Sequence, residues 1–259
     1  MSERLAKILC LRTLDRIVEG AKVTEVLGAD GGPFRTLDLA PQPEGSPLAS
    51  DGPLGVYRVW TGDGVIKKVV YAGISVSSIG MDTHMIYALT DPECGIPHFT
   101  LDSVEAHGTL ALHLDLNPRV DLGSHLPYMD YVYGPLTQIF NEGRAIDGLT
   151  EAQISPRQRA IMSPWMLVFR ATPEAYRQLD TQVNAYLDRW FTMVEQGLPE
   201  DVVDSISDTD LPRRDELNRG LIFSRDVDPV WDQITPLVGQ DASEIMRVNL
   251  AHNPIVREV

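Results

Sequence analysis

The sequence predicts an α+β fold in which helices pack on an antiparallel sheet. Between residues 56 and 116, short β-branched and apolar runs follow one another, joined by connections too short for the crossovers that parallel strands need. After residue 129 the apolar residues change to a helical spacing. Strands followed by helices are typical of the α+β class, and no linker separates two cores, so we expect one domain over residues 1–259.

The first segment of the chain predicts an amphipathic helix over residues 1–20. Apolar residues recur there at three- and four-residue spacing from Leu5 to Val18, and Gly20 is a suitable stop. The stretch 41–53 is rich in Pro, Gly and Ser, which predicts a loop.

Five strands are expected in the sheet. Val56–Trp60 and Val65–Ser75 flank the turn sequence Thr61-Gly62-Asp63-Gly64, which indicates a hairpin. Turn residues also separate the remaining runs, so the strands should form an antiparallel meander. These remaining strands are His84–Leu89, Phe99–Val104 and Thr109–Leu116.

The second half of the chain predicts helices. The strongest is Pro173–Gln196, because Thr172 can cap it, Pro173 suits its first position and Gly197 ends it. Between the helices, 166–169 is a short apolar run and 201–215 is an acidic polar link. The other helical segments are Met129–Asn141, Thr150–Ala160, Asp215–Ser224, Asp228–Leu237 and Ala242–Asn249.

Charge and composition exclude several classes of function. The chain has 22 Lys and Arg against 37 Asp and Glu, a net charge of −15, which argues against nucleic acids and anionic membranes as partners. No segment approaches the roughly 20 apolar residues of a membrane span, and the first residues lack the apolar core of a signal peptide. We therefore expect a soluble, cytoplasmic protein. Two cysteines, Cys10 and Cys94, are too few for a disulfide framework.

Four histidines, His84, His98, His107 and His113, lie in the predicted sheet and raise the question of a metal site. Their spacing matches no known metal-binding pattern, so no bound metal is predicted. The alternative is that they occupy surface or turn positions, which suits His107 beside its glycine.

Asp102 is the most informative single residue, since it lies inside a predicted strand, where Asp is rare. If it faces a pocket, loss of water favours the protonated acid and makes it a proton donor. The alternative is a solvent-facing carboxylate on an edge strand. At the end of the next strand, Asp115 and Arg119 suggest a structural ion pair.

The segment Ile96–Asp102 (IPHFTLD), followed by His107-Gly108 and Leu110–Leu122, resembles red chlorophyll catabolite reductases and the wider ferredoxin-dependent bilin reductase superfamily. In these families a Pro-x-Phe strand with an acidic residue precedes a strand that ends in Asp-Leu-x-Pro. Ser163-Pro164-Trp165 is a similar break before an apolar run, and residues 226–249 loosely match the final helices.

The resemblance implies a single bilin-reductase-like domain, folded as an α/β/α sandwich with a central antiparallel sheet. It implies an open-chain tetrapyrrole as substrate, bound between the sheet and the C-terminal helices. Such enzymes carry no bound metal or flavin; an external donor such as ferredoxin supplies single electrons, and acids of the protein supply protons.

The resemblance also implies site residues. Asp102 matches the acidic residue of the family, and Asp228 is the best match for a second acid, with Asp226 as its rival. His84 is offset by two residues from an expected histidine, which keeps the sheet face, so it completes the catalytic set. The expected substrate-binding residues are His98, which alternation places on the face of Asp102, together with Thr100, His113 and Trp165.

The resemblance also implies partners of the protein, and it leaves other functions open. Docking of an acidic ferredoxin needs a local basic patch, and cationic side chains should also anchor the propionates of the substrate. Two alternatives stay open: a non-redox enzyme that uses Asp102 and a histidine as acid and base, and a tetrapyrrole carrier. The oligomeric state is also open, with a dimer as one option. The candidates for the basic patch are Arg144, Arg157, Arg159, Arg213 and Arg214.

Overall fold

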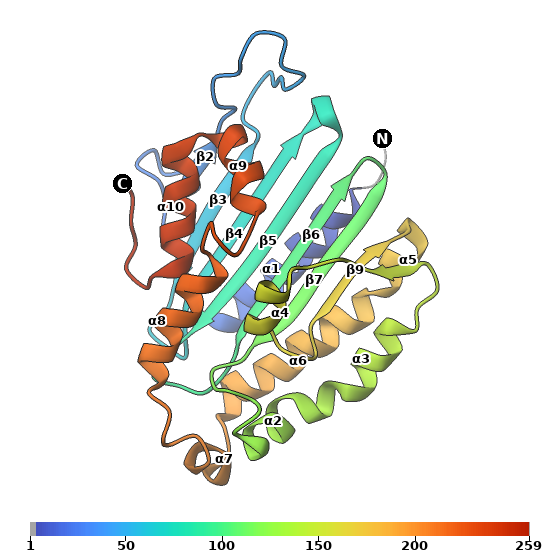
Figure 1. Ribbon diagram of the computed structural model, residues 1–259. Helices are drawn as coiled ribbons and strands as arrows, with labels where there is room; N and C mark the ends of the chain where they lie inside the picture. Colours follow the sequence, from blue (N-terminus) through green and yellow to red (C-terminus); the bar gives the residue numbers. More distant parts are fainter. Residues whose placement is uncertain (1–3, 259) are drawn as a thin grey trace.

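The computed structural model describes residues 4–258 and has a nine-stranded antiparallel sheet at its centre. The strand order is β1-β3-β4-β5-β6-β7-β9-β8, and β2 also pairs with β3. Helices cover both faces of the sheet (Figure 1). The predicted α+β class and the α/β/α sandwich are therefore confirmed.

The five predicted strands form the middle of the sheet. The hairpin of β3 and β4 is confirmed, with Thr61 opposite Lys68, and the antiparallel meander continues through three more short connections to β7. Four of these strands extend beyond the predicted run by one or more residues, and β4 is shifted by one residue from the predicted 65–75. Their bounds are β3 Gly55–Thr61, β4 Ile66–Val76, β5 Met81–Thr90, β6 His98–Ala106 and β7 Thr109–Asn117.

The edges of the sheet contain strands that the sequence pattern does not reveal. At one edge β1 (Thr24–Glu25) and β2 (Arg35–Leu37) are too short to show any alternation. At the other edge the apolar run 166–169 is strand β9 (Leu167–Ala171), which pairs with β7 and with β8 (Leu149–Glu151). The helix predicted from Thr150 is wrong in its first half, because β8 occupies that part.

The helix α4 (Pro156–Ile161) follows β8 and begins where its capping residues allow. Ser155 accepts a hydrogen bond from the N–H of Gln158, and the Gln158 side chain accepts one from the N–H of Ser155. This reciprocal capping box satisfies two backbone donors that a helix start leaves free.

One face of the sheet carries the N-terminal helix and the middle helices. The helix predicted over 173–196 is divided at Leu179. The one predicted over 129–141 starts earlier and contains a 3₁₀ turn (Gly134–Leu136). The helices of this face are α1 Leu5–Ala21, α2 Leu126–Tyr133, α3 Thr137–Arg144, α5 Pro173–Gln178 and α6 Asp180–Gln196.

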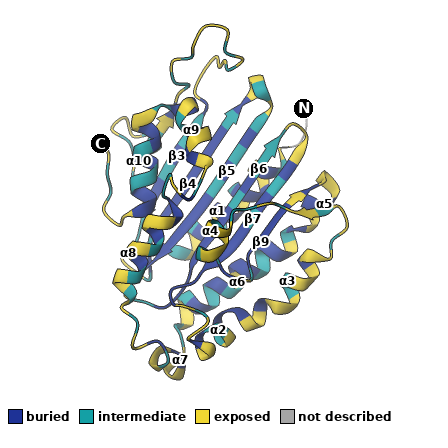
Figure 2. Ribbon diagram, viewed as in Figure 1, coloured by how far each residue is buried: buried dark blue, intermediate teal, exposed yellow. Residues whose placement is uncertain are grey.

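The C-terminal helices α8 (Leu211–Ile222), α9 (Val230–Val238) and α10 (Gln240–Ala251) cover the other face, over β3, β4 and β5. Their inner sides are buried and their outer sides exposed (Figure 2). The acidic link before them is partly helical, as α7 (Glu200–Asp204), which corrects the expectation of a coil. From residue 4 to residue 258, no helix combines the length and apolar character needed to cross a bilayer.

Two buried cations hold the C-terminal end of α10 against the sheet. Lys68 Nζ on β4 donates to the carbonyl oxygens of Asn249 at 3.0 Å and His252 at 2.8 Å. Arg219 on α8 donates to the carbonyl of Leu250 at 2.8 Å. The last carbonyls of a helix have no partner within it, and cations satisfy both them and the helix dipole. Burial, aided by the charge of Arg219, lowers the pKa of Lys68 to about 7.

This lowered pKa predicts that stability depends on pH through Lys68. The folded protein releases the proton near pH 7, whereas the unfolded chain keeps it to about pH 10, so the free energy of unfolding should rise with pH between these values. The expected slope approaches about 1.4 kcal/mol per pH unit. Urea unfolding of the wild type and of Lys68→Met at several pH values measures it. The prediction fails if the difference in the free energy of unfolding between the two proteins does not change with pH.

Candidate active site

A cavity of about 300 Å³ lies between the sheet and the helices α4, α8, α9 and α10. Its floor comes from strands β4 to β7 and β9, and most of its walls are apolar. Four methionines line it, and their flexible, polarisable side chains adapt to a ligand of irregular outline. The apolar residues of the lining include Met85, Met162, Met166, Met246, Ile74, Val168, Phe223, Trp231, Ile234 and Leu250.

The register of the sheet places Asp102 in the floor of this cavity. Asp102 on β6 is paired with Met85 on β5 and with His113 on β7, and His113 is in turn paired with Val168 on β9. Directly paired residues point to the same face of a sheet, so these side chains form one row under the helices. Asp102 is therefore on a central strand, and the alternative of an edge position is wrong.

Asp102 and His113 form a hydrogen-bonded pair. The Asp102 Oδ2 and His113 Nδ1 atoms are 2.8 Å apart, and the other ring nitrogen of His113, Nε2, is buried without a hydrogen-bond partner. Burial disfavours the charged imidazole, but the hydrogen bond and charge of Asp102, with Asp115 and Asp228 adding, raise the pKa of His113. The hydrogen bond to Asp102 therefore favours the protonated imidazole of His113 in the floor of the cavity.

Asp228, just before α9, brings a second carboxyl group into the same cavity. It accepts a hydrogen bond from the N–H of Val230 at 3.1 Å. Burial raises the pKa of Asp228 to about 6, and the charge of Asp102 adds to this shift. The rival residue, Asp226, is exposed and does not line the cavity. Of the acids considered from the sequence, the structure thus brings together Asp102 and Asp228.

A buried polar group supports the floor beside Thr100, which lines the cavity and whose hydroxyl has no partner. Thr100 is paired across the sheet with Asp115, and Asp115 accepts hydrogen bonds from the N–H of Ser163 at 2.9 Å and from its hydroxyl. Burial raises the pKa of Asp115 to about 6 in spite of these donors. The predicted ion pair between Asp115 and Arg119 is wrong, because Arg119 bonds elsewhere.

His84 lies on the opposite face of the sheet, which corrects its expected place in the pocket. Its neighbours on β5, Thr83 and Met85, line the cavity, so alternation turns His84 toward α1. There its Nδ1 is 2.8 Å from the hydroxyl of Tyr71, and its Nε2 is 3.0 Å from Asp82. A shift of two residues keeps the same face of a strand, so the position expected for the histidine also faces away from the cavity, as Asp82 and Ile86 do.

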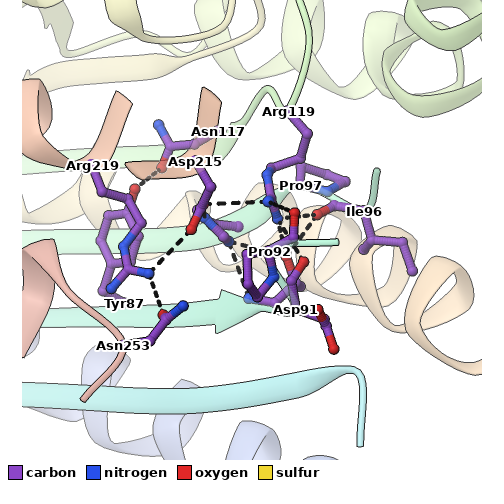
Figure 3. A network of polar contacts seen from close by, with 12 residues as sticks. Tyr87, Asp91, Pro92, Ile96, Pro97, Asn117, Arg119, Asp215, Arg219 and Asn253 are labelled. Carbon is purple, nitrogen blue, oxygen red and sulfur yellow. Dashed lines mark hydrogen bonds and ion pairs between the residues drawn. The ribbon is translucent and has the colours of Figure 1, made fainter. Parts of the chain in front are cut away.

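His98 shares the sheet face of Asp102 as expected, but it lies outside the cavity, under α8. Its Nε2 is 2.7 Å from Asp215 Oδ1, and its Nδ1 accepts from the N–H of Thr90 at 3.1 Å. Figure 3 shows the surrounding network, in which Asp215 also meets Arg119 and Arg219. Burial and the charges of the two arginines lower the pKa of His98 to about 4, so it serves as a neutral structural link.

Trp165 also lies away from the cavity. Its ring stacks on Tyr133 with centroids 5.2 Å apart, and its Nε1 donates to the hydroxyl of Thr137 at 3.0 Å. These contacts belong to the core under α2 and α3, so Trp165 supports the strand β9 from the far side. The neighbouring residues Met162 and Met166, which the sequence did not single out, line the cavity instead.

Comparisons with known proteins bear on the fold. No protein-family model matches the chain, and no curated protein matches it significantly. Among solved structures, phytochromobilin synthase from tomato in complex with biliverdin is similar, with a TM-score of 0.65 and 15% sequence identity over 95% of this chain and 82% of that chain. This similarity confirms that the protein has the fold which the resemblance to bilin reductases implied.

Proposed function

We propose that this protein is an oxidoreductase that reduces an open-chain tetrapyrrole. The observation that carries the proposal is the meeting of Asp102, His113 and Asp228 in an apolar cavity between the sheet and the C-terminal helices. The fold is shared with a tomato protein solved with biliverdin, and the motif around Asp102 resembles the ferredoxin-dependent bilin reductases. Both point to the same class of substrate.

The proposed reaction adds two electrons and two protons to one double bond of the substrate. An external donor such as ferredoxin supplies the electrons singly, and each electron makes the conjugated system more basic, so that a nearby acid protonates it. His113, whose pKa is raised by its hydrogen bond to Asp102, is one donor. Asp228, with its raised pKa, is the second. Two proton donors thus match a two-proton reduction.

The carboxylates of such a substrate need a cation, and within the described part of the chain the cavity lining contains neither Lys nor Arg. Arg170 on β9 is the nearest candidate by register. Arg170 is paired with Ala111, and two residues along the same strands Val168 is paired with His113. Residues two apart share a sheet face, so Arg170 lies on the face of the cavity, where its side chain is exposed. The conjugated system would enter the cavity, and the propionates would stay at this outer end.

An acidic electron donor such as ferredoxin needs exposed cations on this protein. Of the five arginines considered for a basic patch, Arg159 is paired with Glu151 and Arg213 with Glu216, which reduces their value for an acidic partner. Arg157 remains beside the cavity on α4, where its guanidinium donates to the carbonyl of Asp226. A ferredoxin would therefore dock near α4.

A visible-absorbance titration with biliverdin, followed by a chemical or ferredoxin-based reducing system, tests the function. We expect a spectral shift on binding and then bleaching or a blue shift on reduction. A shift without further change would identify a carrier. Absence of binding would exclude bilins as substrates and favour acid–base chemistry on a smaller molecule.

The first variant to test is Asp102→Asn. It should fold and bind bilin, but the rate of reduction should fall by at least about 100-fold, since it removes the acceptor that holds the proton on His113. Asp226→Asn, an exposed residue close to Asp228, is the matched control and should leave the rate unchanged. Full activity in Asp102→Asn would exclude Asp102 from the reaction.

The pKa of Asp228 predicts the pH dependence of the reaction. A proton donor must be protonated, so the single-turnover rate should fall as the pH rises above about 6. In Asp228→Asn the rate should be low and this decline absent. Stopped-flow absorbance over pH 5–8 measures both profiles, and an unchanged decline in the variant would assign it to another group.

The role of Arg170 can be separated from that of the cavity. Arg170→Gln should weaken the binding of biliverdin up to about fivefold, the range of an exposed ion pair, and leave the binding of its dimethyl ester unchanged. Arg35→Gln, at the far edge of the sheet, changes the net charge equally and is the control. Equal weakening of acid and ester would contradict a carboxylate contact.

A further inference from the structure

One of the two carboxyl groups in the cavity has no cationic partner. Asp102 is hydrogen-bonded to His113, whose raised pKa favours the charged imidazole. In the described part of the chain, the carboxylate of Asp228 accepts a hydrogen bond from the N–H of Val230 and forms no ion pair. Carboxylates in apolar surroundings are normally paired with a cation. Ionised Asp228 therefore leaves one negative charge in the cavity without a direct counter-charge.

The rest of the lining suits a compact apolar body. The volume of about 300 Å³ is at the lower end of the range for small-molecule sites. The walls include the rings of Tyr87, Phe223 and Trp231, and the faces of aromatic rings attract a cation. Within the described residues no Lys or Arg lines the cavity. The size and charge of the lining thus favour a small apolar molecule with one positive charge.

We propose that the cavity also binds a compact apolar cation of the organic amine class, whose ammonium group donates hydrogen bonds to the carboxylate of Asp228. Binding is non-covalent, and the ammonium group keeps its proton. The hydrocarbon part would lie among apolar walls such as Ile234 and Met246. Asp102, whose side chain is 36% exposed, offers a second acceptor from the floor.

A bare metal ion is a poorer occupant of the same cavity. Within residues 4–258, no group of three or more His, Cys, Asp or Glu side chains is arranged to hold a metal ion. An ion bound to Asp228 would need to keep most of its water, and apolar walls cannot replace that hydration. An organic ammonium ion needs only a carboxylate and gains from the burial of its hydrocarbon part.

This ligand goes beyond the proposed reduction and has the opposite pH dependence. The titratable side chains of the described lining are Tyr87, Asp102, His113 and Asp228. Burial keeps the pKa of Tyr87 well above its usual value, so Tyr87 stays neutral. The pKa of Asp228 is about 6, so amine binding should strengthen as the pH rises through this value, whereas the proposed proton donation weakens. Loss of the His113 charge at higher pH acts in the same direction.

Calorimetric titration with 1-adamantanamine, 1-adamantanol and 1-adamantanecarboxylate compares three head groups on one rigid hydrocarbon body. Above about pH 7, the wild type should bind the amine about tenfold more tightly than the alcohol, and the carboxylate more weakly than both. In Asp228→Asn the amine should lose this advantage, and the alcohol should bind as before. Asp226→Asn, exposed and outside the lining, is the matched control and should behave as the wild type.

Several results would overturn the proposal. These are equal binding of the amine and the alcohol by the wild type, no binding of either, and unchanged amine binding in Asp228→Asn, which would place the cation elsewhere on this acidic protein. Equal weakening of amine and alcohol in the variant would show that Asp228 only shapes the cavity. The wild-type comparison decides even if the variant does not fold. Bilin and reductant are absent from these titrations, so failure here is distinguishable from failure of the proposed reduction.

Discussion

The carboxylate of Asp215 is the contact on which the arrangement of the C-terminal helices depends. It lies on α8, 2.7 Å from His98 on the sheet and 3.3 Å from both Arg119 and Arg219. Burial would raise the pKa of Asp215, but these three neighbours keep it well below its usual range, so the group stays charged. Removing one partner of a buried ion pair costs about 3–5 kcal/mol. Because Arg219 also binds the end of α10, one buried cluster fixes two walls of the cavity.

Alternation in the sheet then gives its two faces different roles. On the side of α1, Asp82, His84 and Tyr71 lie within hydrogen-bonding distance of one another and support the packing of the helix. On the cavity side, Asp102 is hydrogen-bonded to Nδ1 of the His113 ring, and Nε2 of the same ring has no hydrogen-bond partner. The residue types are alike on the two faces. The difference is that Asp102 and His113 line the cavity, whereas His84 lies between the sheet and α1.

The sequence predicted the order of the central strands and C-terminal helices, and Asp102 and Asp228, which it singled out, both line the cavity. It could not place His84, because β5 is largely buried on both faces and shows no clear apolar alternation. The pairing of His98 with Asp215 joins residues that are 117 positions apart, and no local pattern reports it. The positions of Trp165 and Asp115 depend on the path that the chain takes before β9. That path includes β8, a strand of only 3 residues, which is too short to show a sequence pattern.

The charge of the cavity decides which part of the proposed substrate can enter it. The hydrogen bond and charge of Asp102 raise the pKa of His113, and burial raises the pKa of Asp228 to about 6. An anionic group would be repelled from the cavity by the two carboxyl groups, whereas N–H donors would satisfy them. The open-chain tetrapyrrole that we propose as substrate has N–H groups at its centre and carboxylates at its edge. Its conjugated system would therefore enter the cavity, and its propionates would stay outside.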